Sequence, residues 1–159
     1  MADFYNEIYW AYSISFLKTL AIPSISKTLF RTGKLESQTS KRDDDTRWIL
    51  YFLTVYPKSS PEFTAALKYM NQSHARMGIS NQDYLYVLSL YIVFTIDCFR
   101  NGLGPRRLTS VEETAWFETW VDIGRLMKIQ DLPKSLQEIR TYYLDYEKKY
   151  VRFDPVKVK

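Results

Sequence analysis

Apolar residues recur along most of this chain at the three- and four-residue spacing of amphipathic helices. Several of the periodic segments open on Ser or Thr with an acidic residue three positions later, which is the pattern of a helix N-terminal cap. Others are closed by Pro or Gly, which mark helix ends. The pattern predicts seven helices, over about residues 7–21, 24–33, 42–56, 60–78, 80–102, 109–127 and 135–150, with loops over 34–41 and 102–105.

Residues 87–94 are the one place where a strand competes with a helix. They are rich in β-branched and aromatic side chains, which favour strands. The segment lies inside a longer one that opens on Ser80 and Asp83, so we expect it to be helical. Helices of these lengths must bury their apolar faces against one another. We therefore predict an all-α fold, a compact bundle of about six to seven helices that forms a single domain over residues 1–159.

Composition narrows the choice of protein class. The length of 159 residues fits one domain, and 46% hydrophobic and 25% charged residues are typical of a globular protein. Five glycines and six prolines are too few for a turn-rich sandwich or barrel. A formal net charge of +4 is too small to indicate a nucleic-acid-binding protein. Cys98 is the only cysteine, which excludes an internal disulfide and a multi-cysteine metal site.

The most membrane-like stretch lies near the N-terminus. Residues 8–23 are mostly apolar, but they contain Lys18 and are too short to span a bilayer comfortably. We expect a core or interface helix here and no transmembrane span. The first residues have neither the positive region nor the cleavage site of a signal peptide, so we expect none.

The only histidine, His74, lies on the apolar stripe of the predicted helix 60–78. The stripe places a methionine one turn to either side of it and consists of Phe63, Leu67, Met70, His74 and Met77. A buried imidazole among methionine and aromatic side chains is typical of an axial haem ligand. It is also typical of a hydrogen-bonded core histidine, and position alone favours this second interpretation.

A second candidate group lies at the start of the predicted helix 42–56. Arg42 and Thr46 are one turn apart at the edge of an apolar stripe, a pair able to hold a carboxylate, a haem propionate or bound oxygen. The alternative is a plain helix start, in which Asp43, Asp44 and Asp45 complement the positive end of the helix dipole. Spacing alone favours the helix start.

The predicted helix 80–102 has an aromatic face that fits either a protein core or the wall of a flat cofactor. The face consists of Tyr84, Val87, Leu88, Tyr91, Thr95 and Phe99. Asp97 lies near this face and requires a partner for its charge, for which we expect Arg100 or Arg42.

Other catalytic chemistries find little support. The chain has no G-x-S-x-G, P-loop or G-x-G-x-x-G motif. A Ser–His–Asp triad would have to use His74, but the neighbouring Ser73 cannot face it on a helix. Nothing near Cys98 indicates an activated thiol.

Six segments of the chain resemble one known family in their order and spacing. They are 21–26, Lys41-Arg42-Asp43-Asp44-Asp45-Thr46, 74–89, Arg107-Leu108-Thr109, Trp120-Val121-Asp122-Ile123-Gly124-Arg125 and Asp131-Leu132-Pro133-Lys134-Ser135. Together they are similar to the catalytic domain of the mpaB-type ER-bound oxygenases and rubber oxygenases (latex-clearing proteins), with the first segment closest to the fungal branch. The resemblance covers about residues 5–155 and leaves a tail over 156–159.

This resemblance implies a globin-like helical core that holds haem b. His74 matches the proximal iron ligand of the family. The rubber oxygenases carry an R-x-x-K-T pattern near the distal face, and the matching residues here are Arg42, Asp45 and Thr46, which become the catalytic candidates. Arg42 also suits a haem propionate, and Tyr84 completes the cofactor-binding candidates. Asp45 stands where the rubber oxygenases have lysine, which argues against direct rubber cleavage.

The implied activity is oxidation or cleavage, with O2, of an alkene or of a small hydrophobic or isoprenoid-bearing substrate. The alternative is a degenerate, non-catalytic helical module that binds a partner or a lipid. Family members continue beyond the point that matches residues 153–155, so we expect a short or truncated member whose activity is lost if pocket helices are missing. We expect a partner on the face those helices would cover, and a cytoplasmic or endoplasmic-reticulum-associated protein with peripheral membrane association.

Overall fold

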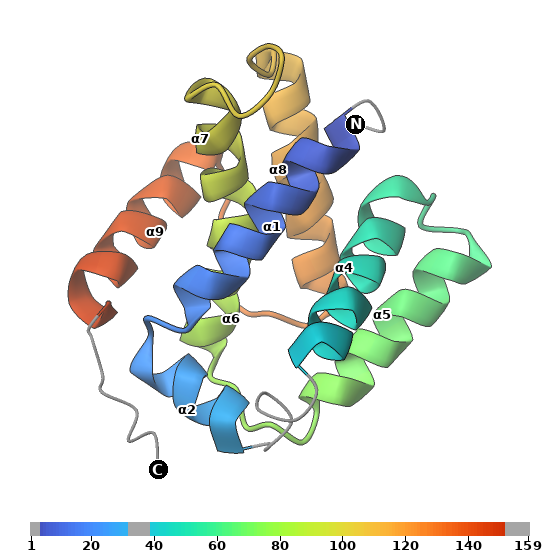
Figure 1. The fold of residues 1–159 in the computed structure, drawn as a ribbon, viewed down its shortest axis with the longest axis vertical. Coiled ribbons are helices and arrows are strands. Elements are labelled where there is room, and N and C mark those ends of the chain that lie inside the picture. Colours follow the sequence, from blue (N-terminus) through green and yellow to red (C-terminus); the bar gives the residue numbers. More distant parts are fainter. Residues whose placement is uncertain (1–3, 32–38, 152–159) are drawn as a thin grey trace.

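The computed structural model describes residues 4–31 and 39–151, with the side chains of Tyr5 and of residues 39–44 outside the description. Every regular element in these ranges is helical (Figure 1). The elements are α1 (Tyr5–Thr19), α2 (Pro23–Arg31), α4 (Thr39–Val55), α5 (Pro61–His74), α6 (Asn81–Ser89), the π-helical η2 (Leu90–Phe94), α7 (Thr95–Arg100), α8 (Ser110–Leu126) and α9 (Leu136–Tyr150). Because α6, η2 and α7 follow one another without a break, the chain forms seven helical rods in its described part, and the all-α prediction is confirmed.

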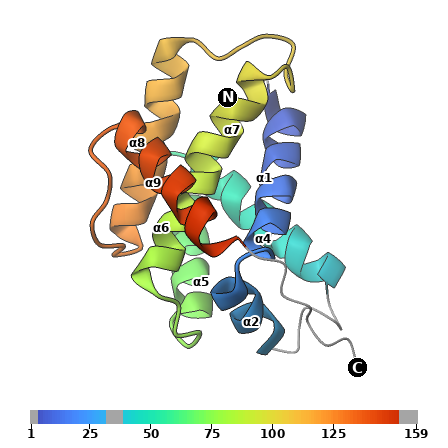
Figure 2. The same ribbon diagram turned by 90° about the vertical axis from the view of Figure 1, so that its left-hand side faces the viewer.

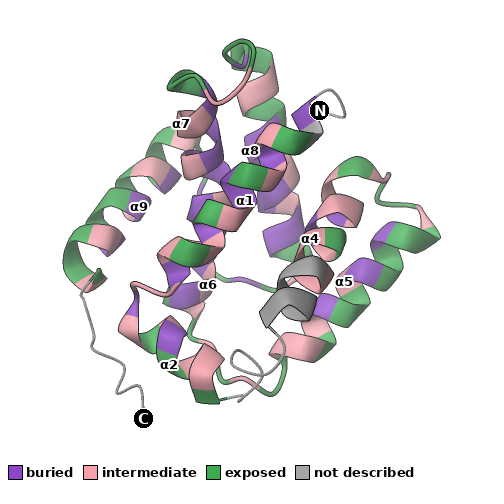
Figure 3. Cartoon of the chain, viewed as in Figure 1, coloured by how far each residue is buried: buried purple, intermediate pink, exposed green. Residues whose placement is uncertain are grey.

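The continuous rod α6–η2–α7 forms the centre of the molecule. Helices α1, α8 and α9 pack against it from three sides, and α4 and α5 form a hairpin beside α1 (Figures 1 and 2). The side chains of Leu90, Ile92, Val93 and Ile96 have no exposure to solvent. Buried positions accordingly line the inner faces of the surrounding helices (Figure 3). Removal of this apolar surface from water is the main force that holds the rods together.

The π-helical turn η2 falls on the stretch where the sequence showed a competing strand signal. β-Branched and aromatic side chains crowd the preceding turn of an α-helix, and a wider turn relieves that crowding. Within η2 the backbone N–H of Thr95 donates to the carbonyl of Ile92. The carbonyl of Tyr91 accepts the indole N–H of Trp116 on α8, at 2.8 Å. A side chain from another helix thus donates a hydrogen bond to a backbone carbonyl in this wider turn.

Four predicted N-terminal caps are confirmed. The hydroxyls of Ser60, Ser80, Thr109 and Ser135 each accept a backbone N–H from the third residue of the helix that follows. At α8 the carboxylate of Glu112 also accepts the backbone N–H of Thr109, which completes a reciprocal capping box. Such caps are worth about 1 kcal/mol each and depend only on neighbours in sequence.

Three predicted helix ends are wrong. Helix α2 begins at Pro23, so Ser24 lies inside it and its hydroxyl donates to Asp83 of α6 at 2.8 Å. Helix α4 begins at Thr39 rather than Arg42, so the predicted loop over 34–41 is helical from Thr39 onward. Helix α5 ends at His74, and Gly78 lies beyond it in a turn with φ +64°. The predicted end of α2 at Gly33 lies outside the described residues.

Candidate functional site

The two groups of candidate residues lie on the two helices of one hairpin. Helix α5 starts at Pro61, directly after its cap Ser60, whose hydroxyl accepts the backbone N–H of Phe63 at 3.1 Å. The turn between α4 and α5 is short, so the helices run antiparallel and pack side by side (Figure 1). The first half of α4, with Arg42 and Thr46, therefore reaches the same end of the hairpin as His74, the last residue of α5.

The apolar stripe of α5 is confirmed only as far as the helix extends. Phe63 and Met70 are buried, and His74 is half-buried. Met77 lies beyond the helix, where its backbone N–H donates to the carbonyl of His74 at 2.9 Å in a turn. The prediction that methionines flank His74 on a common helical face is therefore wrong for Met77, because the helix ends one turn earlier than the spacing indicated.

The imidazole of His74 packs against the ring of Tyr84. The two ring centroids are 5.6 Å apart, with the planes inclined by 70° in an edge-to-face arrangement. Tyr84 is half-buried on α6, and burial raises the pKa of its hydroxyl, so the phenol stays protonated at neutral pH. Nδ1 of His74 is buried as well. Tyr84, a cofactor-binding candidate, thus contacts His74, the predicted iron ligand, and restricts the orientation of the imidazole ring.

The turn after His74 is held from α2. The guanidinium of Arg31, the last residue of α2, donates to the carbonyl of Met77 at 2.6 Å. Ser24 of the same helix donates to Asp83, one residue before Tyr84. Helix α2 is therefore fixed to both segments that position His74 and Tyr84.

The catalytic candidates on α4 are described in part. Asp45 and Thr46 are half-buried in the first half of the helix, and the side chain of Arg42 lies outside the described residues. Directly after them, the guanidinium of Arg47 lies over the ring of Tyr9, 4.4 Å from its centroid, and joins α4 to α1. The position of the N-terminal half of α4 is thus fixed by a cation–π contact.

Asp97 has one of its two predicted partners and a closer one that was missed. Arg100 forms an ion pair with Asp97 at 3.9 Å, and it also forms two hydrogen bonds, at 2.9 and 2.7 Å, to Glu113. The side chain of Arg42, the other predicted partner, lies outside the described residues. Arg140 of α9 forms two hydrogen bonds to the carboxylate of Asp97, at 2.9 and 2.6 Å. Arg140 was missed because it lies 43 residues away in sequence, and no local pattern pairs it with Asp97.

A cluster of tyrosines between α6 and α9 was also missed as a unit. The rings of Tyr86 and Tyr146 are stacked with centroids 4.5 Å apart. The hydroxyl of Tyr86 donates to Glu147 at 3.0 Å, and that of Tyr146 donates to Asp83. Burial, and then the neighbouring carboxylate, raise the pKa of both tyrosines well above the usual value. These hydroxyls are engaged within the protein, so the cluster is structural.

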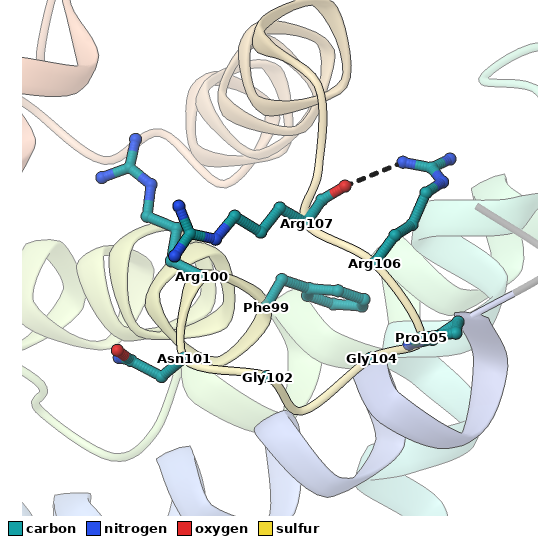
Figure 4. A pocket seen from close by; sticks show the side chains of 8 residues that line it. All are labelled: Phe99, Arg100, Asn101, Gly102, Gly104, Pro105, Arg106 and Arg107. Atoms are coloured by element: carbon teal, nitrogen blue, oxygen red, sulfur yellow. Dashed lines mark hydrogen bonds between the residues drawn. The ribbon is translucent and has the colours of Figure 1, made fainter.

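A surface hollow lies at the loop between α7 and α8, at the opposite end of the molecule from His74 (Figures 1 and 4). Three arginines line it. Two of them already pair with carboxylates, Arg100 with Glu113 and Arg106 with Glu112, the second at 2.7 Å. The hollow therefore has neither the apolar walls of a haem or isoprenoid pocket nor a contact with the candidate residues.

The chemistry of the available donors limits which metal group His74 can hold. In the part of the chain that the structure describes, no group of three or more His, Cys, Asp or Glu side chains is arranged to bind an ion. Burial and then the charge of Asp97 raise the pKa of Cys98, so its thiol stays protonated and is a poor ligand. A haem iron takes four ligands from its macrocycle and needs one imidazole from the protein. A single histidine fits that requirement.

None of the described helices is both long and apolar enough to cross a membrane. Comparison of the chain with family models, with curated proteins and with solved structures found no match. The resemblance to the oxygenases therefore depends on the motifs in the sequence.

Proposed function

We propose that this chain is a haem b-dependent oxidoreductase of the oxygenase type that acts with O2 on an alkene or an isoprenoid-bearing substrate. One observation carries the proposal: the α4–α5 hairpin brings the helix turn of Arg42, Asp45 and Thr46 to the same end as His74, the only imidazole in the chain. These are the two groups of residues on which the resemblance to the mpaB-type and rubber oxygenases depends. The hairpin therefore places one candidate ligand and the candidate polar groups at the same end of two adjacent helices.

His74 is the proposed iron ligand. An imidazole must be neutral to donate a lone pair to a metal, and its ring must be held in one orientation. The edge-to-face contact between Tyr84 and His74 supplies that restraint. The bond from Arg31 to the turn after His74 fixes the backbone at the same point.

Arg42, Asp45 and Thr46 are the proposed polar groups across from His74. The guanidinium of Arg42 is suited to a propionate or to an oxygen ligand, because it presents several N–H donors in one plane. The hydroxyl of Thr46 is a further donor, and Asp45 accepts hydrogen bonds in place of the lysine of the rubber oxygenases. Haem, when bound, supplies the reaction with O2. The protein's part is to orient the cofactor and to keep its surroundings apolar.

A hemin titration of the purified chain tests the proposal. We expect a Soret band that saturates at one haem per chain, and we expect His74→Ala to abolish it while circular dichroism shows an unchanged helix content. Gln72→Ala is the matched control, because Gln72 is exposed on the same helix. Cys98→Ser and Met77→Leu each remove another soft donor and should leave the band in place. A folded chain that takes up no hemin would refute the proposal.

The second candidate function is a non-catalytic helical module that binds a partner or a lipid. Exposed apolar side chains favour it, among them Trp10 and Leu17 on α1 and Trp48 on α4. Peripheral association with a membrane, including that of the endoplasmic reticulum, and a partner that covers this face belong to the same proposal. Delipidated protein that binds neither an isoprenoid nor a lipid vesicle would count against the lipid form of this function.

A further inference from the structure

Helix α1 is apolar on two opposite faces. Its inner face, with Ile8, Ala11 and Tyr12, is buried against the central rod. Its outer face carries three large apolar side chains that are exposed by 58% (Trp10), 38% (Ile14) and 61% (Leu17), and we call these three residues the α1 stripe. A helix that is apolar all round normally has a neighbour on every side. The outer side of α1 lies on the surface of the molecule (Figure 3).

The α1 stripe carries no charge. Between Ile8 and Ile22 the only charged residue is Lys18, and its ammonium group binds Glu147 of α9 at 2.9 Å. Ser13, which lies beside the stripe, donates its hydroxyl to the carbonyl of Tyr9 at 3.1 Å, so it can enter an interface without the loss of a hydrogen bond. Burial of the solvent-facing side of α1 in an interface would therefore cost little desolvation free energy.

The spacing of the stripe favours a second copy of this chain as the occupant. Trp10 and Leu17 lie four residues before and three residues after Ile14, so the stripe is nearly symmetric about Ile14. In an antiparallel pair, the large ring of Trp10 meets the smaller Leu17 of the second copy at both ends, and the two Ile14 residues meet at the centre. A two-fold axis needs this kind of self-complementary surface.

The helix dipoles set the direction of the pair. Two antiparallel α1 helices place the negative end of each dipole near the positive end of the other, and their dipoles are then opposed favourably. A parallel pair would place like ends together. We propose that the α1 stripe is the interface of a homodimer in which the α1 helices of two copies pack antiparallel.

The exposed area indicates how strong the dimer is. The three side chains leave roughly 300 Å² of apolar surface in water, given about 250 Å² for a whole tryptophan and less for leucine and isoleucine. Two copies thus bury roughly 600 Å² of apolar surface, or about 1,000 Å² in total if about 65% of the interface is apolar. Stable interfaces start at about 1,200 Å². The dimer is therefore of the transient kind.

Sedimentation equilibrium of the full chain over about 1 to 300 μM, concentrations at which weak complexes form, tests the proposal. The wild-type mass should rise toward that of a dimer with concentration. Leu17→Glu and Trp10→Lys should each weaken self-association by about tenfold or more, because each would bury an unpaired charge. Val111→Glu and Leu144→Glu are matched controls, because both residues are exposed and apolar but lie on other helices, and they should leave the dimer intact.

An equimolar mixture of Leu17→Glu and Trp10→Lys tests the antiparallel register itself. In the mixed pair, the carboxylate introduced at position 17 of one variant lies opposite the ammonium group introduced at position 10 of the other. The unchanged Trp10 of the first variant and Leu17 of the second meet as in the wild type. We therefore expect the mixture to regain association that neither variant shows alone.

Two results would overturn the proposal. One is a wild-type chain that stays monomeric over the whole range, and the other is a mixture that fails to associate when the wild type does. A monomeric chain that co-floats with anionic phosphatidylserine vesicles unless Leu17 is replaced would assign the stripe to a membrane instead.

Discussion

Two tyrosine-to-phenylalanine substitutions separate the effect of a buried donor from that of a buried acceptor. Tyr86 and Tyr146 are stacked on each other, and each donates its hydroxyl to a carboxylate. Phenylalanine keeps the ring and its packing, so each substitution removes one hydrogen bond and little else. Tyr86 is the more deeply buried tyrosine, with no exposure against 6% for Tyr146. Burial of the donor would thus predict the larger loss for Tyr86→Phe.

The burial of the two acceptors predicts the opposite order, with the larger loss for Tyr146→Phe. Asp83, which accepts from Tyr146, is only 7% exposed, and after Tyr146→Phe its side chain keeps one hydroxyl donor, Ser24. Glu147, which accepts from Tyr86, has a side chain that is 22% exposed and remains paired with Lys18. A hydrogen bond to a charged group is worth about 1.5–3 kcal/mol, and its loss costs less where solvent or another donor can take over the acceptor. We expect losses in the free energy of unfolding of about 2 kcal/mol for Tyr146→Phe and about 1 kcal/mol or less for Tyr86→Phe.

Urea unfolding followed by circular dichroism measures both losses. With a slope of about 2 kcal/mol per molar urea, the midpoint should fall by about 1 M for Tyr146→Phe and by about half of that or less for Tyr86→Phe. The control is Tyr69→Phe, because Tyr69 is exposed on α5 and should have almost no effect. If Tyr86→Phe costs as much as Tyr146→Phe, or more, the acceptor does not determine the loss, and this reasoning is wrong.

Two further predictions concern glycine positions and alkaline pH. A Cβ on Gly104 would lie 2.7 Å from the ring of buried Phe99, so Gly104→Ala should lower the free energy of unfolding by about 1–3 kcal/mol in the same urea assay. Gly124 lies inside α8, where an added Cβ would meet the flexible ends of the side chains of Leu132 and Leu88, so Gly124→Ala should be nearly neutral. Burial raises the pKa of Tyr91 and Tyr142 from 10.0 to about 12. Because these tyrosines ionise near pH 10 only in the unfolded chain, their contribution to stability is complete below about pH 10 and is lost as the pH rises toward about 12. Phenolate absorbance of the native chain should show a late-titrating fraction, and a single transition at about pH 10 for all thirteen tyrosines would contradict this.

The sequence predicted the features of this fold that depend on near neighbours. Each N-terminal cap, such as Ser60 or Thr109, needs only a hydroxyl and an N–H three residues away, so the starts of α5, α6, α8 and α9 could be placed. The end of α5 could not, because the turn after His74 is held by Arg31 from another helix. The same holds for the π-helical turn, where the carbonyl of Tyr91 accepts the indole N–H of Trp116 from α8.

The candidate site, too, could be predicted only where it depends on near neighbours in the sequence. The hairpin that brings the α4 candidates to the end of α5 with His74 follows from the helix order and the short turn between the two helices. The contact of Tyr84 with His74 depends on how α6 packs against α5, for which the sequence offered only an aromatic face. Proximity in sequence suggested Arg100 as a partner of Asp97, but the closer partner, Arg140, could be found only from the position of α9.

A cavity variant tests the proposed haem ligation most directly. His74→Gly removes the imidazole and leaves space for an added one, while the rest of the chain keeps its fold. We predict that hemin gives no histidine-type Soret spectrum with this variant, and that free imidazole restores the wild-type spectrum. A wild-type chain whose hemin spectrum is the same as that of His74→Gly without imidazole would contradict the account.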